Sequence, residues 1–147
     1  MKMIDIGKKD VTEREAVVRG VVHLKPSVIR TIRQKKLPKG DVLEAAKIAG
    51  ILAAKKTPDI IPLCHPIPIE YAKIEFVIRK SQIEIISTIR GRARTGIEME
   101  AFTAVAISAL TIYDMCKSLD RSITVGPIEL LRKSGGKSGT YVRKSKK

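Results

Sequence analysis

Apolar residues recur at helical spacing over residues 38–58. Asp41 stands where a capping residue would begin this helix, and Glu44 follows three positions later, which completes a capping-box pattern. The pattern ends at Thr57-Pro58, because proline disfavours helical geometry in the residue before it. The spacing therefore predicts one well-bounded helix in this part of the chain.

A second apolar pattern of helical spacing covers residues 95–120 and is longer than the first. Thr95 and Glu98 form another capping-box pattern at its start. Residues 27–36 show the same spacing over a shorter stretch. We expect a long helix in the second half of the chain and a short one near its beginning.

Four segments carry the signals of β-strands. Residues 69–80 and 82–92 alternate between apolar and polar side chains across a short connection, so they predict a β-hairpin. Residues 16–26 are rich in valine and end at a proline, which favours a strand. Residues 123–133 predict a last strand, and the Gly126-Pro127 pair within it favours an edge of the sheet.

The main elements follow the order strand, helix, strand, strand, helix, strand. This order is typical of the split βαβ, or ferredoxin-like, fold, an α+β arrangement of an antiparallel sheet with helices packed on one face. No repeat or linker divides the chain. We therefore expect one domain over residues 1–143 and a basic disordered tail at 144–147.

Composition narrows the class of protein. The chain has 147 residues, of which 44% are hydrophobic and 30% charged, as in soluble globular domains. Its longest uncharged run, residues 101–113, is shorter than the roughly 20 residues that span a bilayer, so we expect no membrane association. The N-terminus lacks a signal-like apolar core, and two cysteines are too few for a disulfide scaffold. We therefore expect a cytoplasmic protein.

The net charge of +14 makes nucleic-acid binding the main alternative function. Seven Lys or Arg and no acid lie in residues 132–147, so half of the excess charge belongs to the last sixteen residues. Aromatic residues make up only 3%, which leaves little surface for stacking bases. We expect no nucleic-acid partner, because the remaining charge is moderate and suits a polyphosphate substrate. A purely structural oligomer is a further alternative.

Cys64 and His65 stand together in a proline-rich run, TPDIIPLCHPIPIEY. Prolines fix their own φ and restrict the residue before them, so His65 is held in a narrow conformational range. The other metal-ligating candidates, His23 and Cys116, are far away in sequence, and we expect no metal site. The open alternatives for His65 are a backbone hydrogen bond or a role in catalysis.

Carboxylates at both ends of the long predicted helix are candidate site residues. A role in capping the helix could account for Glu98. No such structural role accounts for Glu100, whose neighbours in the sequence are apolar. Asp114 follows thirteen uncharged residues and faces Lys117 three positions later. Two alternatives are open for this pair. One is a modest ion pair on a solvated helix face, and the other is partial burial, which would shift the pKa of Asp114 toward neutrality with Lys117 opposing that shift.

Two lysines lie where anions are commonly bound. Lys39 precedes the N-terminus of the first long helix, and Lys137 lies in SGGKSG at 134–139. The second stretch lacks the first glycine of a P-loop, so a Walker-type nucleotidase is excluded. Solvated lysines are the alternative for both.

The helical pattern also sets a distance. Glu100 and Asp114 are fourteen residues apart, which corresponds to about 21 Å along one helix. If both residues belong to one site, the helix must break or the site must be shared between subunits.

Three collinear stretches, KGDVLEAAKIAGILAAKKTPDIIPLCHP, TGIEMEAFTAVAISALTIYDMCK and GGKSG, resemble the cyclic pyranopterin monophosphate synthase family, also called molybdenum cofactor biosynthesis protein C. The resemblance covers nearly the whole chain and implies that the domain over residues 1–143 is catalytic. It implies a ferredoxin-like subunit in a homohexamer, a trimer of dimers with active sites at dimer interfaces. It also implies a lyase, early in molybdenum cofactor biosynthesis, that converts (8S)-3',8-cyclo-7,8-dihydroguanosine 5'-triphosphate to cyclic pyranopterin monophosphate and diphosphate.

The resemblance further implies roles for particular residues. Asp114, Lys117 and His65 match the catalytic positions, and the remaining matches are to substrate-binding positions: Leu63, Cys64, His65, Met99, Glu100, Glu98, Lys39, Arg14 and Lys137. The nucleotide substrate comes from a radical enzyme that cyclises GTP. No cofactor is required, although Mg²⁺ accompanying the triphosphate or diphosphate stays an open alternative.

Overall fold

The computed structural model describes residues 1–144, so the predicted tail at 144–147 lies outside the described residues except for Lys144. Antiparallel pairing joins the strands in the order β2-β3-β1-β4-β5. The strands are β1 (Thr12–His23), β2 (Tyr71–Ile78), β3 (Gln82–Ala93), β4 (Thr124–Ser134) and β5 (Tyr141–Val142). The order of the four long strands confirms the ferredoxin-like prediction.

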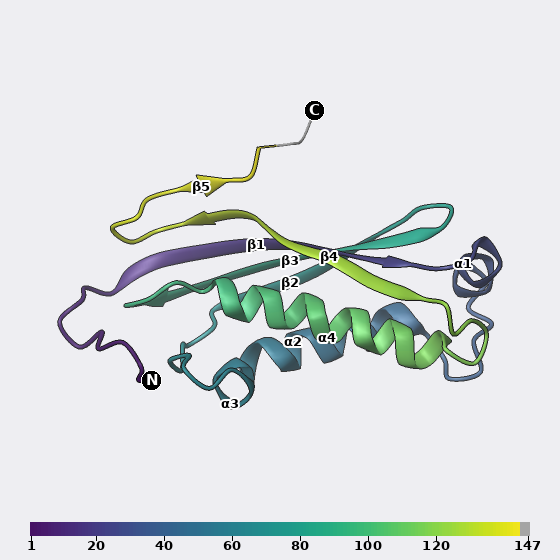
Figure 1. Cartoon of the computed structure of the whole chain (residues 1–147), viewed down its shortest axis with the longest axis horizontal. Coiled ribbons are helices and arrows are strands. Elements are labelled where there is room, and N and C mark those ends of the chain that lie inside the picture. Colours follow the sequence, from purple (N-terminus) through teal and green to yellow (C-terminus); the bar gives the residue numbers. More distant parts are fainter. Residues whose placement is uncertain (145–147) are drawn as a thin grey trace.

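Two long helices cover one face of the sheet (Figure 1), which confirms the predicted arrangement. The helices are α1 (Pro26–Arg33), α2 (Val42–Lys55), α3 (Thr57–Ile60) and α4 (Glu98–Cys116). On β1 the side chains of Ala16, Val18 and Val22 face these helices and are fully buried. The alternation along the strand therefore places the hydrophobic core between the sheet and α2 and α4.

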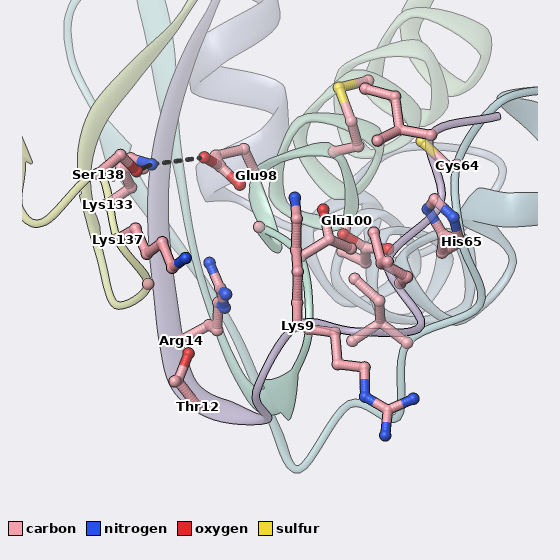
Figure 2. Close-up of a pocket in the computed structure, with 18 of the residues that line it drawn as sticks. Lys9, Thr12, Arg14, Cys64, His65, Glu98, Glu100, Lys133, Lys137 and Ser138 are labelled. Atoms are coloured by element: carbon pink, nitrogen blue, oxygen red, sulfur yellow. Dashed lines mark hydrogen bonds and ion pairs between the residues drawn. The ribbon is translucent and has the colours of Figure 1, made fainter.

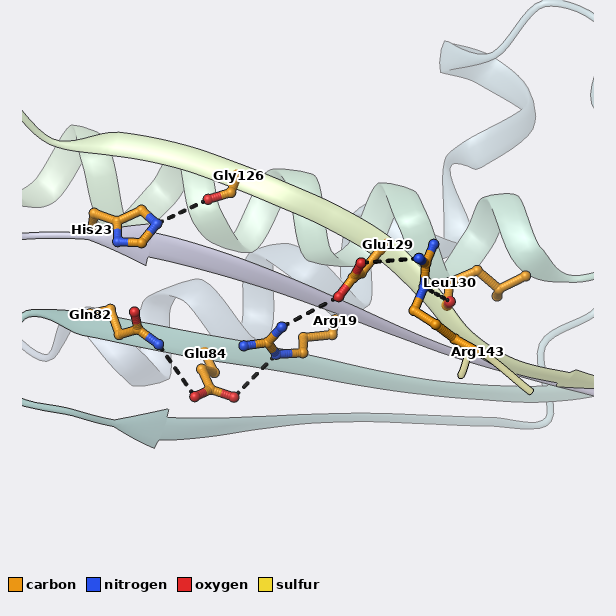
Figure 3. Close-up of polar contacts among 8 residues, drawn as sticks. All are labelled: Arg19, His23, Gln82, Glu84, Gly126, Glu129, Leu130 and Arg143. Carbon is orange, nitrogen blue, oxygen red and sulfur yellow. Dashed lines mark hydrogen bonds and ion pairs between the residues drawn. The ribbon is translucent and has the colours of Figure 1, made fainter. Parts of the chain in front are cut away.

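The opposite face of the sheet carries charged side chains (Figure 3). Arg19 on β1 donates to Glu84 on β3 at 3.2 Å and to Glu129 on β4 at 3.3 Å. Arg143, beyond β5, pairs with the other oxygen of Glu129 at 3.3 Å. One guanidinium thus joins three neighbouring strands, and the end of the described chain is attached to the same network.

Two buried hydroxyls fix α4 against its neighbours. Ser87 on β3 donates to the carbonyl of Ala101 at 2.9 Å, and Ser108 on α4 donates to the carbonyl of Ala46 on α2 at 2.8 Å. By length and composition, α4 is long and apolar enough to cross a membrane. Its packing against β3 and α2 identifies it as the central helix of the folded domain.

The boundaries of the elements differ in part from the predictions. Asp41 does cap α2, accepting bonds from the backbone N–H groups of Leu43 at 3.1 Å and Glu44 at 3.2 Å. The second predicted capping box is wrong, because α4 begins at Glu98 after Ile97, which provides no side-chain cap. The Glu98 carboxylate instead lies 3.5 Å from the Lys133 ammonium.

The sequence patterns missed three details of the fold. β1 begins at Thr12 rather than residue 16, and the short elements α3 and β5 were not predicted. β5 pairs with Arg132 and Lys133 and so lies outside β4 in the sheet. Within residues 1–144 the predicted edge position holds only for the part of β4 around Gly126-Pro127, which β5 does not pair. That Gly-Pro peptide bond is cis.

Gly50 permits the close contact of α2 with α4. A Cβ at this position would overlap the side chains of Ser108 and Ile74 and would lie 2.8 Å from the Ala104 carbonyl oxygen. We expect Gly50→Ala to lower the stability by about 1–3 kcal/mol through overpacking, although alanine favours helices. Thermal unfolding measures the change, with the exposed-face variant Lys47→Ala as the control. An unchanged or raised Tm for Gly50→Ala would contradict this packing.

Candidate functional site

A cavity of about 990 Å³ lies at the end of the sheet where β1 begins and β3 and β4 end. Its wall includes the first turn of α4, the loop after α3, the loop after β4 and residues 1–11, called the N-terminal segment below (Figure 2). A cavity of this size is at the upper end of the range for small-molecule sites. Six Lys or Arg side chains and three carboxylates line it, so an anionic ligand is favoured.

The structure brings eight of the sequence-predicted site residues to this cavity. These residues are Arg14, Leu63, Cys64, His65, Glu98, Met99, Glu100 and Lys137. They come from four separate parts of the chain, and their gathering follows from the topology of the sheet. The other three, Lys39, Asp114 and Lys117, lie together at the opposite end of α4.

His65 lines the cavity from the proline-rich loop. The loop is attached to the sheet through the backbone N–H of Glu70, which donates to the Arg90 carbonyl at 3.0 Å. His23 is the histidine that bonds to backbone, with its ring 3.2 Å from the Gly126 carbonyl oxygen. Within residues 1–144 the His65 ring forms no such bond, so its nitrogens are available to a ligand.

Glu100 is the most deeply buried charged group of the cavity wall, with 2% of its surface exposed. Its Oε2 has no hydrogen-bond partner within the described residues. Burial raises the pKa of the Glu100 carboxyl, its own backbone N–H opposes that change, and the charge of Glu98 adds to it. Burial and then the Glu100 charge raise the pKa of the nearby Cys64 thiol, which favours the protonated, unreactive form.

Cationic groups occupy the other side of the cavity. Arg14 is oriented by a 3.2 Å bond from its Nε to the Ala93 carbonyl, and the glycine-rich loop after β4 passes close to its guanidinium. Lys133 lies between Glu98 at 3.5 Å and the Ser138 hydroxyl at 2.6 Å. Lys137 extends from the same loop toward Arg14 (Figure 2). This side therefore has the character of a polyphosphate site.

At the far end of α4, Asp114 accepts from two lysines. Its carboxylate lies 2.8 Å from the Lys39 ammonium and 2.6 Å from that of Lys117. Bonds from Lys117 and then Lys39 lower the pKa of Asp114 to about 2, and the same contact with Asp114 raises the pKa of Lys117. Of the two alternatives for this pair, the single subunit shows the ion pair on a solvated face, because 54% of the Asp114 side chain is exposed.

The two clusters cannot meet within one subunit. α4 is one continuous helix from Glu98 to Cys116, so the alternative of a broken helix is excluded. Glu100 and Asp114 therefore stay about 21 Å apart along the helix axis. A small molecule bound at Glu100 does not reach Asp114 of the same chain.

Sequence reasoning missed the contribution of the N-terminal segment to the cavity. Its lining residues are Lys2, Ile4, Ile6, Lys9 and Asp10. The segment has no apolar periodicity that would predict a helix or strand. The Lys8-Lys9 pair is the feature of its sequence that could have indicated a place near a binding site for anions. Within residues 1–144 no group of three His, Cys, Asp or Glu side chains is arranged to hold a metal ion.

Glu100→Gln tests the burial of this carboxyl through the pH dependence of stability. Because the pKa of Glu100 is raised in the folded state, the folded protein binds this proton more tightly than the unfolded chain does. The stability therefore falls as the pH rises from the ordinary pKa of a glutamate through the raised pKa of Glu100. At a pH above neutral, we expect Glu100→Gln to increase the free energy of unfolding by about 1–3 kcal/mol, which is measured as a higher Tm. Near pH 4 we expect this gain to be lost. The control is Glu98→Gln, which removes a paired carboxylate. An equal change at both pH values would contradict the prediction.

Gly136→Ala tests the contact between the glycine-rich loop and Arg14. Gly136 has φ 77°, and a Cβ there would overlap the Arg14 guanidinium. We expect the variant to bind inorganic diphosphate roughly tenfold more weakly, as measured by calorimetry, because Arg14 is displaced. Gly139→Ala is the matched control, since Gly139 also has a positive φ, 65°, but has open space around it. Equal binding by both variants would exclude this role of Gly136.

Comparisons with known proteins show which family the chain resembles. The model of the MoaC family matches residues 3–136, which include every element from β1 to β4. A cyclic pyranopterin monophosphate synthase of Roseiflexus castenholzii is 50% identical over 143 residues, which are 96% of this chain and 90% of that protein.

Two further relatives carry the same name. The protein of Pelotomaculum thermopropionicum is 48% identical over 97% of this chain and 85% of its own length. That of Chloroflexus aurantiacus is 49% identical over 97% of this chain and 88% of its own length. A family match over most of the chain, with relatives at this identity and coverage, identifies the family. The chain belongs to the MoaC family.

Proposed function

We propose that this chain forms cyclic pyranopterin monophosphate, the product for which its relatives are named, as a lyase of molybdenum cofactor biosynthesis. The substrate is the 3',8-cyclised dihydro-GTP, and diphosphate is the second product. One observation carries the proposal: a cationic cavity with a buried carboxyl lies at one end of α4, and a lysine–aspartate–lysine cluster lies at the other. We propose that one end from each of two subunits forms the complete site.

The cavity supplies binding of the nucleotide. Arg14 and Lys137 face the anionic part of the substrate and neutralise the diphosphate as it leaves. Glu98 and Glu100 accept from N–H groups of the guanine-derived ring, with His65 beside them. Protonation of Glu100, favoured by its raised pKa, also makes this carboxyl a donor to a ring carbonyl.

The end of α4 that carries Asp114 and Lys117 supplies the acid–base chemistry. Rebuilding a purine into a pterin breaks and forms C–N bonds, and each step moves protons. Asp114 is ionised in the single subunit because Lys117 and Lys39 surround its carboxylate. A partner subunit covering this exposed pair would remove water from it and move the pKa of Asp114 back toward neutrality, where it exchanges protons more readily. Lys117 is then the neighbouring proton donor.

The assembly and the surroundings of the reaction are part of the proposal. Two-fold symmetry makes the sharing reciprocal, so each dimer has two sites, and three dimers form a hexamer. A radical enzyme that cyclises GTP supplies the substrate, which leaves no redox step to this protein. Mg²⁺ enters, if at all, with the triphosphate or diphosphate. We expect these reactions to take place in the cytoplasm.

Mixed oligomers test the shared site. Asp114→Asn and His65→Ala each remove one half of the site, and we expect either variant alone to assemble normally and to lose at least about 100-fold in turnover. Subunits of the two variants, denatured and refolded together at equal ratio, should regain roughly a quarter of the wild-type activity, because random pairing restores about one site in four. Product formation is measured by chromatography after oxidation to a fluorescent pterin.

The separate outcomes exclude different parts of the proposal. No recovery in the mixture would place the site within one subunit and overturn the sharing. Near-normal product formation by Asp114→Asn alone would exclude its catalytic role. Lys47→Ala, on the exposed side of α2, is the control for the refolding procedure.

A further inference from the structure

The loop between α1 and α2, residues 34–41, brings Lys39 to the end of α4. The Lys39 ammonium donates to the Asp114 carboxylate at 2.8 Å and to the Asp114 carbonyl at 3.2 Å. Figure 1 shows α1 and the C-terminal end of α4 at the same end of the sheet. Because the Lys39 side chain is half-exposed, packing alone does not hold its ammonium in place. Its position therefore depends on the conformation of the loop.

An ion pair closes this loop across its two ends. The Lys35 ammonium lies 3.0 Å from Oδ2 of Asp41. The other oxygen, Oδ1, caps α2 by accepting from the backbone N–H groups of Leu43 and Glu44. The bond from Lys35 is the largest cause of the lowered pKa of Asp41. One carboxylate thus fixes both the start of α2 and the ends of the segment that carries Lys39.

The backbone at Lys35 points to a role for its side chain. Lys35 has φ 54°, and within residues 1–144 it is the one residue other than glycine with a positive φ. It lies just beyond the end of α1, a place where glycine is favoured because a Cβ is unfavourable in this conformation. Such strain persists where the surrounding structure requires it. A glycine here would fit the backbone better but would leave Asp41 without its partner.

We propose that Lys35 and Asp41 are positioning residues, which hold Lys39 against the carboxylate of Asp114 by closing the loop between α1 and α2. Within residues 1–144 the charged groups that contact Asp114 are Lys39 from the loop and Lys117 from α4 itself. Opening the loop would leave Asp114 with Lys117 alone. The inference rests on the proposed function for its effect on turnover, whereas the contact it explains is present in the free subunit.

Titration of Asp114, followed by carbon NMR of its carboxyl, tests the positioning in the free protein. Asp41→Ser keeps a residue that caps α2 but is too short to reach Lys35 as well. We expect Asp41→Ser and Lys35→Gly each to raise the pKa of Asp114 above about 2. We expect the acid dissociation constant to fall roughly three- to tenfold.

The signs of the two changes separate positioning from long-range electrostatics. Asp41→Ser removes a negative charge and Lys35→Gly removes a positive one, so a purely electrostatic effect would move the pKa of Asp114 in opposite directions. Loss of the contact with Lys39 raises it in both variants. A pKa that rises in only one variant, or in neither, would overturn the inference.

Matched controls carry the same charge changes beside the pair. Lys36→Ala removes an adjacent, exposed ammonium. Glu44→Gln removes an exposed carboxylate from the first turn of α2, where it pairs with Lys47. We expect both controls to leave the pKa of Asp114 nearly unchanged. A rise in Lys36→Ala equal to that in Lys35→Gly would assign the effect to charge and overturn the positioning.

Stability and turnover separate positioning from folding. We expect Lys35→Gly to keep or raise Tm, because glycine suits the positive φ, and to lower kcat roughly three- to tenfold. If Lys35 acts through Lys39, adding Lys35→Gly to Lys39→Met lowers kcat no further. An equal further loss would overturn the inference. A wild type that forms no product would overturn the proposed function, while the titration of Asp114 still decides the positioning.

Discussion

The rigidity of α4 determines what a single subunit can do. The helix is continuous over nineteen residues, and buried hydroxyls on β3 and α4 fix it to the sheet and to α2. Because a helix of this length does not bend back on itself, its two ends face different surroundings. One end closes a cavity lined by cations, and the other carries an exposed carboxylate between two lysines. The two-subunit site proposed for the reaction follows from this separation.

Much of the fold could be predicted from the sequence, because it depends on local periodicity. The alternation in residues 69–92 predicted the hairpin of β2 and β3, and Asp41 predicted the start of α2 through a cap that the structure contains. The failures arose where tertiary contacts outweigh a local pattern. Thr95 and Glu98 match the sequence pattern of a capping box, but no side chain caps α4. The Glu98 carboxylate lies beside Lys133 from β4.

The sequence predicted a set of candidate site residues, eight of which line one cavity, but it did not predict their geometry. The motifs around His65 and Glu100 identify chemistry, whereas their meeting with Arg14 and Lys137 depends on how the sheet is ordered. The exposure of Asp114 could not be decided from the sequence, because a run of uncharged neighbours does not tell which side of a helix is covered. The N-terminal segment lacks any period, so its place over the cavity comes from tertiary structure alone.

Both cysteines lie in surroundings that disfavour the reactive thiolate. Burial raises the pKa of Cys116 to about 11, and the pKa of Cys64 is raised as well, so neither thiol ionises readily at neutral pH. Thiolate is the form that attacks disulfides, peroxides and alkylating reagents. The raised pKa values therefore disfavour reaction of either thiol with such reagents near neutral pH.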